Sequence, residues 1–66
     1  MKKKKEKIVV FKVIQGDYGY GWSDLVDYNS EDENEMKEMA RDFYSYKMNE
    51  PNVPHRIITR LDKVID

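Results

Sequence analysis

The first apolar segment of the chain is rich in β-branched residues. Positions 8–14 are apolar except for Lys12, and Val9, Phe11 and Val13 fall on one side of an extended chain while their neighbours fall on the other. A strand that is apolar on both faces is typical of the centre of a sheet. We therefore predict a central strand over residues 8–14.

Turn residues separate this strand from a second one. Residues 16–21 hold all three glycines of the chain, and glycine adopts positive φ at little cost. Residues 22–28 then alternate, which places Trp22, Val26 and Tyr28 on one face together with Asp24. The two strands are predicted to form a hairpin, in which Trp22 packs on the helix that follows.

A helical pattern begins after the second strand. Ser30 and Glu33 match a capping box, in which Ser30 is the N-cap residue. Apolar residues then recur at the spacing of one helix face, at Met36, Met39, Ala40 and Phe43, followed by Tyr46 or Lys47. The helix is expected to end near residue 48 or 49, because Pro51 and Pro54 cannot continue it.

A third strand over residues 55–65 completes the pattern. A right-handed crossover places it beside the first strand. The sequence thus predicts an α+β fold, a small ββαβ domain with a three-stranded antiparallel sheet of order 2-1-3 and one helix packed on one face. Phe43 is expected to be buried against Val9, Phe11 or Val13. The domain spans residues 8–66, and residues 1–7 are expected to form a basic disordered arm.

The net charge of −1 conceals a strong asymmetry along the chain. Residues 1–7 carry a net charge of +4, whereas residues 17–50 carry ten acidic and three basic side chains. An acidic helix face is usually just solvated surface. As a functional hypothesis, however, the acids form a negative array that docks on a basic protein cleft. The candidate protein-binding residues are Asp24, Asp27, Glu31, Asp32, Glu35, Glu38 and Asp42.

An alternative is nucleic-acid binding by the basic arm and the aromatic residues near the turn. Residues 19–22 resemble the middle of the RNA-recognition-motif signature, whose rings stack on bases. The match fails at Tyr18 and Ser23, and residues 8–66 carry a net charge of −5, which repels phosphate. The residues of this alternative are Lys2, Lys3, Lys4, Lys5, Tyr18, Tyr20 and Trp22.

Several chemistries lack the residues they need. There is no cysteine and only His55 as an imidazole, which argues against nucleophilic catalysis and a zinc site. A calcium-loop frame that starts at Asp27 has Asp32 where the turn requires glycine. We therefore expect no catalytic residue, no metal and no cofactor. No segment has the roughly 20 apolar residues of a membrane span, so we expect a cytoplasmic protein with no membrane partner.

Two segments carry a resemblance. Residues 13–26, VIQGDYGYGWSDLV, and residues 49–60, NEPNVPHRIITR, follow a pattern like V-x-Q-G-x-Y-G-x-G-W-x-D-L and N-E-P-x-x-P-x-R-I-I-x-R. The chain thereby resembles a family of small uncharacterised proteins of phages, prophages and bacterial genomes. The sequence departs from the pattern at Leu61, where many members have a second arginine. The resemblance implies a mobile-element setting and an accessory role. We accordingly expect the protein in the cytoplasm of a bacterial host.

These observations favour a small non-enzymatic accessory protein that binds a protein partner. Inhibition of a host or defence protein through the acidic surface is one form of that hypothesis. Nucleic-acid binding is the less favoured alternative. A three-stranded sheet also has exposed edges, so a homodimer can form through an edge strand.

Overall fold

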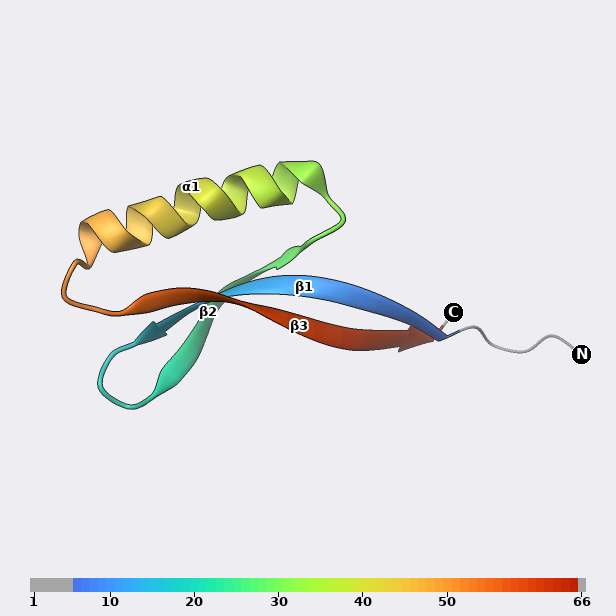
Figure 1. Ribbon diagram of the computed structural model, residues 1–66, viewed down its shortest axis with the longest axis horizontal. Coiled ribbons are helices and arrows are strands. Elements are labelled where there is room, and N and C mark those ends of the chain that lie inside the picture. The colour runs from blue at the N-terminus through green and yellow to red at the C-terminus, as the bar shows by residue number, and fades with distance from the viewer. Residues whose placement is uncertain (1–5, 66) are drawn as a thin grey trace, which may run out of the picture.

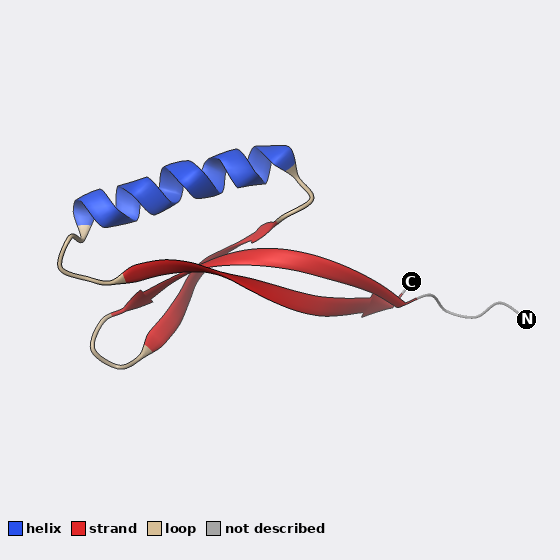
Figure 2. Ribbon diagram, viewed as in Figure 1, coloured by secondary structure: helices blue, strands red, loops and turns tan. Residues whose placement is uncertain are grey.

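The computed structural model describes residues 6–65. They form β1 (Glu6–Asp17), β2 (Trp22–Asn29), α1 (Glu33–Asn49) and β3 (His55–Ile65) (Figure 1). The strands make one antiparallel sheet in the order β2-β1-β3, and α1 lies over one face of it (Figure 2). The predicted ββαβ fold and strand order are thus confirmed.

β1 is longer than predicted at both ends, because β3 pairs with it from Glu6 opposite Ile65 to Gly16 opposite His55. Glu6 and Lys7, which the sequence assigned to the basic arm, therefore belong to a strand. β2 pairs only with residues 11–17 of β1. The β1–β3 pair consequently continues past the N-terminal end of α1 as a two-stranded ribbon (Figure 1). Lys2, Lys3, Lys4 and Lys5 lie outside the described residues.

The helix covers the face of β1 that carries Ile14. Opposed residues of antiparallel strands share a face, and Ile14 lies opposite Val26 and Ile57. Tyr28, on the same face, is hydrogen-bonded to α1. We call this the helix-side face and the other the open face. Strand alternation also places Lys12 on the helix-side face, where its ammonium group donates to Thr59 within the sheet.

The expected partners of Phe43 were therefore wrong. Val9, Phe11 and Val13 alternate with Ile14 along β1 and lie on the open face, away from α1. The sequence offered apolar residues on both sides of the strand, so it did not determine which side the helix covers. Phe43 itself is half-buried rather than buried.

α1 packs along a stripe that is rotated from the predicted one. Half-buried Met36, Met39, Phe43 and Tyr46 follow helical spacing, but Ala40 is exposed and Asp42 is half-buried in its place. Asp42 tolerates this position because it accepts a hydrogen bond there. No described residue of α1 is fully buried. The buried apolar core consists of Val13, Ile14 and Tyr28.

The N-cap of α1 is Asp32 and not Ser30. The Asp32 carboxylate accepts hydrogen bonds from the backbone N–H groups of Asn34, at 2.9 Å, and Glu35, at 3.3 Å. Both the backbone N–H and the hydroxyl of Ser30 instead donate to the carbonyl of Val10, at 3.0 and 2.7 Å. The predicted capping box was wrong because residues 29–32 form a turn, which fastens to β1 before the helix begins.

The β1–β2 loop holds its tip in a fixed conformation. The Asp17 Oδ1 atom accepts hydrogen bonds from the backbone N–H groups of Gly19, at 2.9 Å, and Gly21, at 3.3 Å. Gly19 and Gly21 have φ of 104° and 99°, values that favour glycine. Tyr20 lies between them and is 97% exposed.

The Cα atoms extend over 56 × 28 × 11 Å, so the molecule is thin. Within residues 6–65, no helix is both long and apolar enough to cross a membrane. In the same part of the chain, no group of three or more His, Cys, Asp or Glu side chains is arranged to hold a metal ion.

Candidate functional site

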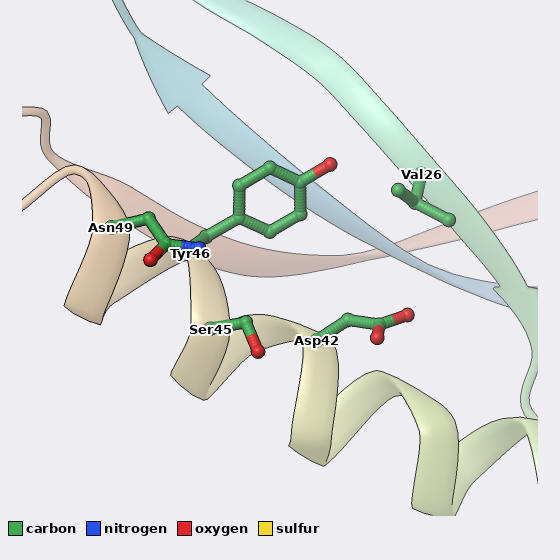
Figure 3. Close-up of a pocket in the computed structure, with 5 residues that line it drawn as sticks. All are labelled: Val26, Asp42, Ser45, Tyr46 and Asn49. Carbon is green, nitrogen blue, oxygen red and sulfur yellow. The ribbon is translucent and has the colours of Figure 1, made fainter.

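An open hollow of about 340 Å³ lies between α1 and β2 (Figure 3). Val26 lines it from the strand, and four helix residues line it from the other side: Asp42, Ser45, Tyr46 and Asn49. Figure 3 shows the Tyr46 ring and the Asp42 carboxylate extending from the helix toward the strand. The hollow thus combines an apolar wall with polar side chains that can orient a bound group. We call it the β2 groove.

The β2 groove lies beside a free strand edge. In the described sheet β2 pairs only with β1, so its other edge has no strand partner. Along such an edge, alternate residues direct backbone N–H and C=O groups outward, where an added strand can bond to them. A free edge and a side-chain hollow therefore lie next to each other along β2.

Asp42 is held in a fixed position in the β2 groove. The Tyr28 hydroxyl donates a hydrogen bond to Asp42 Oδ2 at 2.7 Å, and Tyr28 is only 3% exposed. Burial and this hydrogen bond to the carboxylate raise the pKa of the Tyr28 phenol well above its ordinary value. Tyr28 is protonated and donates at neutral pH, and the raised pKa keeps it a donor under more alkaline conditions. Among the described side chains, no lysine or arginine forms an ion pair with Asp42.

The predicted acidic residues of the helix lie on the flank of α1 that faces β2. Glu35 accepts a hydrogen bond from the backbone N–H of Asn29 at 3.2 Å. Glu38 precedes Asp42 by one helical turn, and its charge contributes to the raised pKa of Tyr28. Glu35 and Asp42 are half-buried. These two acids therefore do not lie on a fully solvated helix face.

The other predicted acids lie on β2 and on the turn that follows it. Glu31 and Asp32 are exposed in the β2–α1 turn, and Asp32 caps the helix. Asp24 and Asp27 point to the open face of the sheet, opposite Gln15 and Val13. The seven acids therefore border the β2 edge from both faces of the sheet and do not form one helix face.

A hydrogen-bonded network crosses the open face. Arg60 forms an ion pair with Asp24, and Asp24 Oδ1 also accepts a hydrogen bond from the Gln15 amide at 2.7 Å. The hydrogen bond from Arg60, more than that from Gln15, lowers the pKa of Asp24. Because Asp24 is on β2 and Arg60 on β3, the pair spans β1 at the level of Val13. This explains why Val13 is only 1% exposed on a face that no helix covers.

Trp22 belongs to the same open face. The Arg56 guanidinium lies over its ring at 4.1 Å from the centroid, and Arg56 Nε donates to Gln15 Oε1 at 2.8 Å. The prediction that Trp22 packs on the helix was wrong. A register shift between Ile14 and Gln15 places Trp22 opposite Asp17, on the open face.

The aromatic residues of the nucleic-acid alternative point in different directions. The Tyr18 hydroxyl donates to Glu50 at 2.7 Å, and its ring lies edge-on to His55. Tyr20 projects from the loop tip, and Trp22 lies on the open face under Arg56. The three rings therefore do not form one platform on which successive bases stack.

His55 lies inside a small cluster near the start of β3. Its side chain is 1% exposed, its Nε2 atom is 3.3 Å from Glu50 Oε1, and its ring lies 5.5 Å from that of Tyr46. The His55 ring is therefore packed within the fold, against Glu50, Tyr18 and Tyr46.

The sequence did not reveal the residues of the β2 groove other than Asp42. Val26, Ser45, Tyr46 and Asn49 come together only because α1 turns that flank toward β2. No local motif encodes this rotation. The only sign of it in the sequence is that the polar residues at positions 42, 45 and 49 fall on one flank of the helix.

No family model, no curated protein and no solved structure matches this chain.

Proposed function

We propose that this chain is a non-enzymatic protein-binding module that captures an extended, basic segment of its partner as an additional strand on β2. One observation supports this most directly: the free edge of β2 runs beside a hollow lined by Val26 and Asp42. Strand addition uses an edge and a hollow together: backbone hydrogen bonds along the edge supply affinity, and the hollow selects every second side chain of the added strand.

The chemistry of the β2 groove favours lysine or arginine on the captured strand. The aliphatic stem of either side chain packs on apolar surface while its charged end stays polar. Here Val26 and Tyr46 offer that surface, and Asp42 offers a carboxylate without an ion-pair partner among the described side chains. The captured strand is therefore basic at the positions that face the groove.

The surroundings of the groove are negatively charged, like Asp42 inside it. Glu38 lies one turn from Asp42, and Asp27 is exposed on the other face of β2. These charges attract a basic segment and accelerate its association at low ionic strength. They also disfavour nucleic acid at this edge, because its phosphates are negative.

We also propose that capture of this segment inhibits the partner. A partner whose basic segment is held as a strand cannot use that segment elsewhere, so capture suits an inhibitory accessory protein in a bacterial cytoplasm. The resemblance to phage and prophage proteins motivates that setting. A homodimer through an edge strand also remains a proposal, and β3 is available for it when β2 holds the partner.

A designed peptide tests capture directly. The probe is an acetylated, amidated peptide of alternating threonine and lysine, with a threonine–glutamate peptide of equal length as its counterpart. We expect calorimetry to detect binding of the lysine peptide only. Asp42→Asn should weaken it about tenfold by removing a charge-assisted contact, while its amide oxygen still accepts from Tyr28. Glu33→Gln, which removes an exposed carboxylate elsewhere on α1, should leave affinity unchanged.

Backbone methylation of the probe separates strand addition from simple charge attraction. Methyl groups on alternate peptide nitrogens remove the donors on one edge and leave all lysine charges in place. One of the two methylation patterns should abolish binding and the other should preserve it. Equal binding of both patterns, or tight binding of a single-stranded oligonucleotide with none of the peptide, would contradict the proposal.

A further inference from the structure

The second free edge of the sheet belongs to β3, and exposed apolar residues lie beside it on the helix-side face. β3 pairs only with β1 in the described sheet. Leu61 of β3 is 65% exposed and lies opposite Val10, on the helix-side face. Ile8, on the same face of β1, is 55% exposed. These residues lie on the β1–β3 ribbon, which extends beyond α1 (Figure 1).

We propose that β3 pairs with β3 of a second copy, antiparallel and centred on Leu61, to form a six-stranded sheet. This inference specifies the edge-strand homodimer included in the proposed function and leaves the β2 edge free for the partner. A second copy is the occupant because the β3 edge complements itself, best in the register centred on Leu61. An uncovered apolar edge strand otherwise favours uncontrolled association.

The geometry restricts the registers. Two antiparallel strands related by a two-fold axis must place one residue opposite itself, and both helices then lie on the same side of the sheet. With Leu61 on the axis, an apolar residue faces an apolar residue. Arg60 of each copy, which also pairs with Asp24 of its own chain, then lies opposite Asp62 of the other, and Thr59 lies opposite Lys63. Opposite charges across strands stabilise a pair.

Neighbouring registers lack this complementarity. An axis at Arg60 places two arginines together and sets Ile58 opposite Asp62. An axis at Asp62 places two aspartates together and sets Leu61 opposite Lys63. Like charges that oppose each other directly are destabilising, so both registers are disfavoured.

The register centred on Thr59 is the closest competitor. It sets Ile57 opposite Leu61 and Arg56 opposite Asp62, which is favourable, but it also sets Ile58 opposite Arg60 and His55 opposite Lys63. The His55 side chain is also committed to its cluster with Glu50 and Tyr46. The register centred on Leu61 avoids these mismatches.

Single cysteines test the register, because the chain has no cysteine of its own. Paired residues of antiparallel strands have Cα atoms about 4.5–5.5 Å apart, within the range of a disulfide. Leu61→Cys should therefore cross-link to itself under mild oxidation. Thr59→Cys and Lys63→Cys should each remain uncross-linked alone and should cross-link when mixed. Self-linkage of Thr59→Cys, or no linkage of any variant, would overturn the proposal.

The unmodified chain supplies the second measurement. Sedimentation at increasing concentration should show a mass rising toward twice that of the monomer. Asp62→Arg, which faces Arg60 of the other copy, should raise the dissociation constant at least about tenfold. Asp27→Arg, an equal charge change on β2, should not. A monomer at all concentrations refutes self-pairing but leaves peptide capture at β2 intact, so the two failures are distinguishable.

Discussion

Tyr28 connects the core of the molecule to its candidate site. Its ring is buried in the core, and its hydroxyl fixes Asp42 in the β2 groove. A tyrosine can do both because its body is apolar and its tip is polar. Stability and binding therefore depend on one side chain.

Tyr28→Phe should destabilise the fold by about 1.5–3 kcal/mol, the usual contribution of a hydrogen bond to a charged group. Urea unfolding measures the change. Tyr18→Phe is the matched control, because it removes a hydrogen bond to Glu50 from an exposed tyrosine. Tyr18→Phe should have the smaller effect, because water solvates both the Tyr18 hydroxyl and the Glu50 carboxylate. Equal effects of the two substitutions would contradict the role given to Tyr28.

The raised pKa of Tyr28 also predicts an alkaline loss of stability. A phenol with a raised pKa in the folded state contributes stability that is fully present below the unfolded value of about 10. That contribution is lost as pH rises through the folded value. The free energy of unfolding should therefore fall above pH 10, and it should fall less steeply in Tyr28→Phe. Parallel pH profiles of the two proteins would argue against this linkage.

At the scale of elements, the start of α1 depends on Asp32. Asp32→Ala should cost about 1 kcal/mol, as loss of an N-cap does, and should accelerate amide exchange at Asn34 and Glu35. Ser30→Ala should leave those two amides protected, because Ser30 bonds to Val10. Faster exchange at Asn34 in Ser30→Ala alone would restore the capping box that the sequence suggested.

The side chains of α1 are only half-buried, so replacing one with alanine should lower the free energy of unfolding less than it would in a deep core. Phe43→Ala should destabilise by roughly 2 kcal/mol, about half of the 3–5 kcal/mol expected for a fully buried phenylalanine. Tyr44→Ala, on the exposed flank of α1, is the control with little expected effect. Thermal unfolding of both variants checks the difference. A loss of 4 kcal/mol or more for Phe43→Ala would show deeper burial than the structure has.

Element order, strand order and the end of α1 followed from the sequence because they have strong local signals. Prolines stop the helix, glycines form the loop, and the most apolar segment takes the centre of the sheet. Side-chain direction was harder to predict. One extra residue, at the shift near Gln15, moved Trp22 to the open face. The turn through Asp32 and the bond from Tyr28 rotated α1, which brought Asp42 inward and left Ala40 outside.

On the scale of the whole molecule, the two free edges differ in character. Acidic residues border β2, whereas β3 carries Arg56, Arg60 and the exposed Leu61. With β1 between them, the edges can act independently. A thin molecule with few buried side chains gains much from added strands, because each one covers exposed backbone and apolar surface.

Amide hydrogen exchange of β2, with and without the threonine–lysine peptide, tests capture most directly. Bound peptide should slow exchange in an alternating pattern at the β2 amides that point away from β1, except that of Asn29, which already bonds to Glu35. Asp42→Asn should reduce this protection. The amides of β1 should change little, because they already bond within the sheet. Binding that protects the β1–β2 loop or the open-face residues, and leaves the outer amides of β2 unchanged, would contradict strand addition at β2.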